Sequence, residues 1–234
     1  MRKTDSNRFI FSAYANPLGA VLHKPVKEFL TDVPCAALPV NGGFISQAKE
    51  NISFHIGSAE ILKAGRATAS VLGERRDGHY VSLATSTVEK LNILDVITAD
   101  RVVCRVTSVY PFHDHPRRCQ DEKLHPAKFF FGGSHFENLR IDGKHIKCEI
   151  ETPETEEGFM IKSAETSRAY IFPVSYCETH IPQFGSIYLG EKDAYGGKVI
   201  LTMLRVELGC AHEGSATAGG GSTNGSDAKT TTPH

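Results

Sequence analysis

Three short stretches of the chain share one pattern, in which a glutamate is followed by bulky apolar residues two and four positions later. The stretches are residues 50–54, 89–93 and 137–141. Alternating apolar and polar residues are typical of a β-strand with one buried face. A strand unit that recurs predicts a fold built by repetition rather than around one catalytic motif. The pattern therefore constrains the architecture and says little about activity.

The spacing of the three stretches narrows the fold class. They begin 39 and then 48 residues apart, which is too irregular for a solenoid, whose coils need nearly equal lengths. Asp-Gly dipeptides at residues 77–78 and 142–143 predict tight hairpins between strands. We therefore expect an all-β fold, an antiparallel β-sandwich or distorted barrel, with short helical turns at residues 26–30 and 94–100.

Composition along the chain predicts three segments. Residues 1–43 are rich in proline and glycine and are expected to form a loop-rich segment that packs on the sheet. Residues 44–210 carry the strand signals and are expected to form the β domain. Residues 211–234 are dominated by glycine, serine, threonine and alanine. We expect this tail to be disordered, because it cannot bury enough apolar surface to offset its ordering entropy.

Charge and apolar runs argue against several classes of function. The 234-residue chain has a formal net charge of −1 and no tryptophan, whereas a nucleic-acid-binding protein usually has a basic balance. We therefore expect no nucleic-acid partner. We expect no membrane span, since no apolar run reaches 18 residues, and no signal peptide, since the first apolar run covers only residues 9–11. The six cysteines are widely spread without a Cys-x-x-Cys pair. They are expected to be reduced thiols in a cytoplasmic protein.

Two strings of residues resemble a known group of sequences. Residues 84–103 read Ala-Thr-Ser-Thr-Val-Glu-Lys-Leu-Asn-Ile-Leu-Asp-Val-Ile-Thr-Ala-Asp-Arg-Val-Val, and residues 133–143 read Gly-Ser-His-Phe-Glu-Asn-Leu-Arg-Ile-Asp-Gly. In this order they look like an uncharacterised family of bacterial β-rich proteins. More distantly, they resemble the choice-of-anchor P domain of bacterial surface proteins. The resemblance covers roughly residues 40–150 and the ending at 201–209. It implies an all-β fold and a bacterial source, and it supplies no catalytic residues.

The three glutamates are the first candidates for a binding site. On a regular strand Glu50, Glu89 and Glu137 would each share a face with the apolar residues that follow, where a carboxylate is costly unless it is paired. If the strands are neighbours, the carboxylates could converge and bind a hard cation or act as an acid–base pair. The alternative is a solvated carboxylate at a rim, paired with an arginine. The candidate arginines are Arg101, Arg105 and Arg140.

Histidines and cysteines offer a second and less specific candidate. His113, His115 and Cys119 lie in one polar loop, and Cys177 and His180 are three residues apart. These side chains supply enough nitrogen and sulfur ligands for zinc. A structural zinc site usually has tighter paired spacing on both sides, so the alternative is solvated histidines and unrelated thiols. No cofactor is expected.

The function that fits these observations is a non-enzymatic structural or binding β domain. The chain contains no nucleophile elbow, no Walker lysine loop and no glycine-rich dinucleotide motif. The partner would be a protein or a carbohydrate, contacted by the polar loops at residues 110–127 and 151–158, since such loops on a rigid sheet often carry recognition. An exposed sheet edge could also permit self-association. The alternative function is a metal-dependent or carboxylate-based hydrolase.

Overall fold

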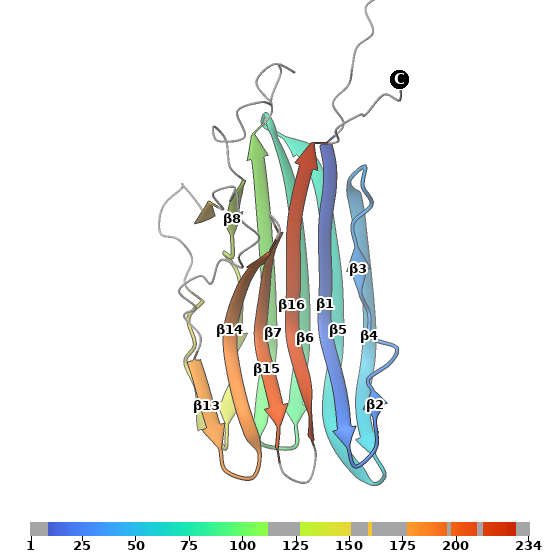
Figure 1. The fold of residues 1–234 in the computed structure, drawn as a ribbon, viewed down its shortest axis with the longest axis vertical. Helices are drawn as coiled ribbons and strands as arrows, with labels where there is room; N and C mark the ends of the chain where they lie inside the picture. Colours follow the sequence, from blue (N-terminus) through green and yellow to red (C-terminus); the bar gives the residue numbers. More distant parts are fainter. Residues whose placement is uncertain are drawn as a thin grey trace, which may run out of the picture.

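The chain folds into two antiparallel β-sheets stacked face to face, as the computed structural model shows (Figure 1). The structure describes residues 9–111, 127–150, 159–160, 177–195, 198–209 and 213–227. Within these ranges every regular element is a strand. The longest strands run side by side along the long axis of the molecule, so that the sandwich is elongated (Figure 1).

Within the described residues, sheet A contains seven strands, each antiparallel to its neighbour. In spatial order they are β13 (Cys177–Ile181), β14 (Gly185–Tyr195), β15 (Lys198–Leu208), β16 (Glu213–Asp227), β1 (Phe9–Lys24) and β2 (Glu28–Phe29), with β3 (Ala36–Ala37) also paired to β1. The last strand in sequence, β16, therefore lies in the middle of the sheet, between β15 and β1.

Sheet B is built on a meander of four long strands. These are β4 (Gly43–Ile56), β5 (Ala59–Arg76), β6 (His79–Ile93) and β7 (Ile97–Pro111). Five short strands continue the sheet beyond β7: β8 (Lys128–Phe130), β9 (His135–Glu137) and β10 (Arg140–Ile141) pair with β7 directly, while β11 (Lys144–His145) pairs with β10 and β12 (Phe159–Met160) with β8. Sheet B thus ends on β4 at one side and on short strands at the other.

The predicted all-β antiparallel sandwich is confirmed, and the strands that the structure describes form two open sheets. The Asp-Gly hairpins are also confirmed: Asp77 and Gly78 both have positive φ, at 50° and 75°, as the tightest hairpin turns require. The expected helical turns are wrong for the part of the chain that the structure describes. Leu94 and Asp95 have φ of 51° and 56° and form a turn between β6 and β7. The Asp95 amide stabilises this turn by donating a hydrogen bond of 2.9 Å to Asn92 Oδ1.

The expected disordered tail is wrong for residues 213–227, which form β16; residues 228–234 lie outside the described part. A strand paired on both sides satisfies its backbone hydrogen bonds without needing large side chains. Its small residues let the two sheets approach closely. A Cβ added to Gly221 would lie 3.2 Å from Cys104 Sγ in the opposite sheet. The glycine-rich and serine-rich composition of residues 213–227, which is typical of a polar linker, therefore belongs to a central strand with small side chains.

The expected loop-rich segment at residues 1–43 also begins differently, because Phe9–Lys24 is the long strand β1. Phe9, Phe11, Ala13 and Ala15 alternate along it and are buried, which is the period of a strand. Beyond β1, the chain to residue 42 follows the side of the sandwich, adding β2 and β3 to sheet A.

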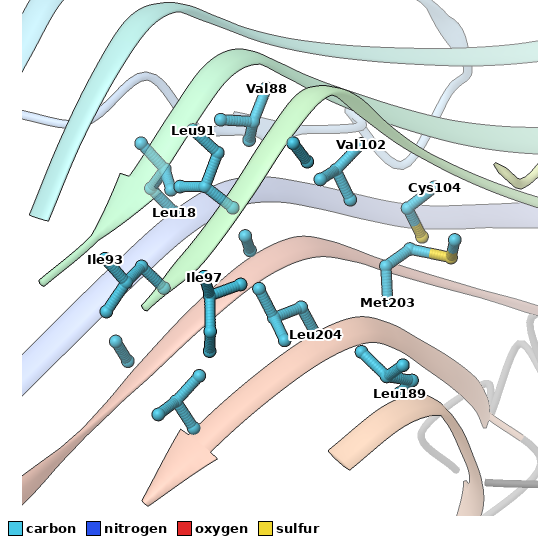
Figure 2. Packing of buried hydrophobic residues seen from close by; sticks show 14 of the residues in the cluster. Leu18, Val88, Leu91, Ile93, Ile97, Val102, Cys104, Leu189, Met203 and Leu204 are labelled. Atoms are coloured by element: carbon cyan, nitrogen blue, oxygen red, sulfur yellow. The ribbon is translucent and has the colours of Figure 1, made fainter. Parts of the chain in front are cut away.

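The core between the sheets consists of two clusters. The larger one packs Leu91, Ile97 and Val102 of sheet B against Leu189 and Leu204 of sheet A (Figure 2). The smaller one lies at the end where β1 begins and contains mostly alanines and aromatic rings. In it the rings of Phe9 and Tyr80 stack with centroids 4.1 Å apart. The two ends of the sandwich are thus filled by side chains of different size.

Candidate functional site

The structure brings the three glutamates of the repeated pattern into one row that crosses sheet B. The strand register places Glu50 of β4 opposite Arg66 of β5, and Arg66 opposite Glu89 of β6. Glu89 lies opposite Arg101 of β7, which in turn lies opposite Glu137 of β9. We call these five residues the charge row. Acidic and basic side chains alternate along its whole length.

Arg101 joins two of the glutamates directly. Its Nη2 is 3.3 Å from Glu89 Oε1, and its Nη1 is 3.2 Å from Glu137 Oε1. Nε2 of His135 is also 3.2 Å from Glu137 Oε1. The hydrogen bond from His135, together with the positive charge of Arg101, lowers the pKa of Glu137, and the charge of Glu137 raises the pKa of Arg101. These groups are partly exposed, so each pair contributes little to stability.

The expectation that these glutamates share a face with the apolar residues after them is wrong. The residue after each glutamate is in the left-handed region, with φ of 53° at Asn51, 53° at Lys90 and 50° at Asn138. One residue in this conformation shifts the alternation, so that the glutamate points to solvent while the next apolar residue is buried. Leu91 is accordingly only 2% exposed and Leu139 only 1%.

An irregularity in the register lies beside the charge row on each strand of the meander. One residue next to the charge row has no register partner on β4, β5, β6 and β7, and Asn138 lies between β9 and β10. These residues are Asn51, Gly65, Lys90, Asp100 and Asn138. We call them the kink row. Sheet A has a matching row, in which Gly190 and Gly219 have φ of 71° and 70° and lie beside Met203 and Pro17. Both sheets are therefore kinked at one level.

This geometry separates the carboxylates instead of bringing them together. An arginine-bearing strand lies between Glu50 and Glu89, and another between Glu89 and Glu137. Among the residues that the structure describes, no group of three histidine, cysteine or acidic side chains is placed to hold a metal ion. The charge row is thus an alternating surface stripe, and a binding role for its three glutamates stays a prediction.

The other two candidate arginines make different contacts. The backbone of Arg105 exchanges two hydrogen bonds with Ser134, with the amide 2.9 Å from Oγ and Oγ 3.0 Å from the carbonyl oxygen. Arg140 donates from Nε to Asn138 Oδ1 at 3.3 Å. Pairing of the glutamates with an arginine is therefore found for Arg101.

Most of the histidine and cysteine candidates lie outside the described residues. This applies to His113, His115 and Cys119, and almost entirely to the loops at 110–127 and 151–158. Cys177 begins β13, and His180 is exposed, with Nδ1 3.2 Å from Ser186 Oγ. The zinc site therefore stays a prediction.

Three of the described cysteines lie in different environments. Cys35 is exposed, Cys148 is intermediate and Cys104 is buried. Burial raises the pKa of the Cys104 thiol to about 12, and a hydrogen bond with Ser86 opposes this rise. Its Sγ faces Leu201 O at 3.5 Å across the core. Cys104 is therefore an apolar packing group rather than a nucleophile.

Sheet A carries its own charged cluster on the outer face. Arg205 binds Glu191 through two bonds of 2.7 Å and also contacts Glu207. Its guanidinium lies 3.9 Å from the ring centre of Tyr188, and the hydrogen bonds that it donates to Glu191 raise the pKa of Arg205. The cluster satisfies its own charges, as a structural ion pair does.

The sequence predicts an exposed sheet edge but does not indicate which strand forms it. In the structure an open edge is formed by β4. Within the described residues, β4 pairs with β5 along its whole length and with no strand on its other side. Beside the start of β4, Val40 is 59% and Phe44 is 66% exposed. Side chains of the edge hold the preceding segment instead, since Lys49 binds Asp32 and Gln47 accepts a bond from the Cys35 amide at 3.4 Å.

The sequence matches a family described as Domain of unknown function (DUF8256) over residues 9–170. The chain belongs to the DUF8256 family. The matched residues include the whole meander of sheet B, the charge row and β1, whereas β13 to β16 follow them in sequence. No curated protein and no solved structure matches the chain significantly. An uncharacterised family is therefore confirmed, and the choice-of-anchor P resemblance stays a prediction.

The described residues contain no helix long and apolar enough to cross a membrane.

Proposed function

We propose that this chain is a non-enzymatic binding module, that its partner is a protein, and that the partner is held along the outer edge of β4. The observation that carries the proposal is the length of this edge. β4 spans 14 residues and pairs on one side, whereas β5, β6 and β7 have partners on both sides.

An open edge offers a row of backbone donors and acceptors that an extended peptide can satisfy. Natural edges are protected by devices that include proline, charged side chains such as lysine, bulges and a covering helix or loop. The β4 sequence contains no proline, and its one lysine, Lys49, is engaged with Asp32. Proline and an unpaired lysine, two of these devices, are therefore absent from β4.

The chemistry around the edge favours a protein over a carbohydrate. Val40 and Phe44 expose apolar surface there, which side chains of an added strand can cover. A sugar would instead require several converging polar groups, and the outward residues of β4 that are polar are spaced along the strand. A sugar bound in this way would also leave the backbone N–H and C=O groups of the β4 edge without partners.

The hydrolase alternative receives no support from the arrangement of the carboxylates. Catalysis by a carboxylate pair requires both groups to flank one reacting bond. Glu89 and Glu137 instead both contact Arg101, which lies between them. An arginine in that position pairs with both carboxylates, so that the two do not flank one reacting bond.

The proposal is tested by offering both partner classes to the full chain. Random 12-residue peptides displayed on phage and an array of glycans are screened, and bound ligands are mapped by amide hydrogen exchange. We expect peptides to be selected and to slow exchange in β4 without slowing it in β13. Selection of glycans alone, of peptides that protect another strand, or of neither class would overturn the proposal.

A further inference from the structure

We infer that the partner strand runs antiparallel to β4 and places an arginine or lysine beside Glu50, directly after a glycine or aspartate. This inference rests on the proposed function and specifies its partner. It follows from the two rows that cross sheet B, because a strand added to β4 becomes the next member of both rows.

The charge row ends on an acidic residue at the open edge. Arg101 shows how the row is satisfied, since it contacts a glutamate on each side at 3.3 and 3.2 Å. Glu50 has Arg66 opposite it on the β5 side, is exposed, and has no strand on its other side in the described part of the chain. Residues directly opposite on neighbouring strands lie about 5 Å apart. A basic residue on an added strand would therefore complete the alternation.

The kink row specifies the residue beside that arginine. Strands in the direction of β4 carry the left-handed residues, at Asn51 and Lys90. Strands in the opposite direction carry Gly65 and Asp100 at this level, each preceded by alanine and followed by arginine. The Gly65 position is narrow, because a Cβ there would lie 3.2 Å from Cβ of Lys90. Next to β4 and β6, sheet B thus has strands with the same local sequence, which is alanine, then glycine or aspartate, then arginine.

A second copy of this chain does not satisfy the same rows. If two β4 strands paired antiparallel with their Asn51 residues opposite each other, the outward Glu50 of one strand would face the buried Ile52 of the other. The kinks of the two strands therefore could not align, and no basic residue would face Glu50. Joining the β9 side of one copy to β4 of another would bring Glu137 towards Glu50, and like charges opposite each other are destabilising. The rows therefore select a different, basic segment.

A charge exchange between protein and peptide tests the inference. The probe is a fluorescent synthetic peptide that copies residues 61–72, which contain the Ala-Gly-Arg pattern of β5. Its counterpart carries Arg66→Glu. The full chain is compared with Glu50→Arg and with the control Ser46→Arg, which places the same arginine side chain at an exposed position of β4 outside the charge row. Binding is measured by fluorescence polarisation at low and high salt, and the site is mapped by amide exchange.

We expect Glu50→Arg to weaken binding of the probe by about fivefold to tenfold at low salt, because it removes one cross-strand attraction and adds a like-charge repulsion of similar size. The Arg66→Glu peptide should restore binding to this variant, high salt should reduce the difference, and Ser46→Arg should change affinity by less than about twofold. If peptides bind at β4 with an affinity that does not depend on the charge exchange, the inferred pattern is wrong and edge binding stands. If neither the probe nor the library peptides protect β4, the proposed function is wrong as well.

Discussion

At the residue scale, buried hydroxyl groups are found on both of the stacked sheets. Ser82 and Ser108 face each other across β6 and β7 and are 0% exposed, and Thr223 of the opposite sheet is 1% exposed. Among the described residues, these hydroxyls have no hydrogen-bond partner. A buried polar group without a partner lowers stability by roughly 1–3 kcal/mol. Small size, rather than polarity, explains serine at these positions.

Replacing one of these serines should therefore stabilise the protein. We expect Ser108→Ala to raise the free energy of unfolding by about 1 kcal/mol, because it removes an unpartnered hydroxyl and fits the same space. The matched control is Ser134→Ala, which removes two hydrogen bonds to the backbone of Arg105 and should lower the free energy of unfolding by about 1 kcal/mol. Urea unfolding of the three proteins measures both changes. A loss of stability in Ser108→Ala would show that the hydroxyl has a partner.

Two thiols should differ sharply in reactivity. With its pKa at about 12, the Cys104 thiol is ionised in about one molecule in ten thousand at pH 8, whereas Cys35 is exposed. We expect iodoacetamide to modify Cys35 in the folded protein and to modify Cys104 only after unfolding. Peptide mass spectrometry resolves the two sites. Equal modification of both in the folded protein would contradict the placement of Cys104 in the core.

At the scale of the elements, the kink row explains why the glutamates of the repeated sequence pattern all lie on the outer surface of sheet B. Glu50, Glu89 and Glu137 point outward because the next residue has positive φ, and the strand continues with its apolar residues inward. In sheet A the same level is held by Gly219, whose added Cβ would lie 2.9 Å from Met203 and 3.0 Å from Val102 of sheet B. The two kinked sheets therefore fit together at this point.

A pair of glycine substitutions separates backbone strain from packing at the kink. Gly219→Ala combines a positive φ of 70° with close contacts, whereas Gly143→Ala has φ of 71° and no atom within 4 Å. We expect Gly143→Ala to lower stability by about 1 kcal/mol, and Gly219→Ala to cost roughly a further 1–3 kcal/mol through overpacking. Thermal unfolding compares the two. Equal losses would show that the sheets are not in contact at Gly219.

The sequence predicts the strands of sheet B well, because alternation reports burial wherever the backbone is regular. It places Leu91, Ile93 and Ile141 correctly in strands and inside the core. It fails at the faces of the glutamates, since counting by twos assumes that no residue leaves the β region. Asparagine at 51 and 138 is a known signal for positive φ, but lysine at 90 is not. The pairing of Glu89 with Arg101 also depends on register, which a single strand does not reveal.

At the scale of the whole molecule, the sandwich is closed by its last strand. β16 lies between β15 and β1 and contacts β6 and β7 across the core. Its glycine-rich composition hides this role from sequence analysis, because propensity and hydrophobicity both describe side chains, whereas the strand contributes mainly backbone pairing and close approach. Sheet A would be split into two parts without it.

Truncation tests this dependence on β16. A chain ending after Gly209 lacks the strand, so that β15 and β1 lose their shared partner, and we expect it to show no cooperative unfolding transition. A chain ending after Asp227 keeps β16 and should unfold as the full chain does. Circular dichroism during heating distinguishes the two. A cooperative transition of unchanged midpoint in the shorter chain would mean that β16 is dispensable.

Residue-resolved hydrogen exchange, measured by NMR on the full chain, tests most directly the arrangement of a central β16 and an open β4. We predict that the β16 amides exchange as slowly as those of β6, because both strands are paired on two sides. Along β4, slow amides that face β5 should alternate with fast amides that face solvent. Fast exchange throughout β16, or uniform protection along β4, would contradict the fold and with it the proposed binding edge.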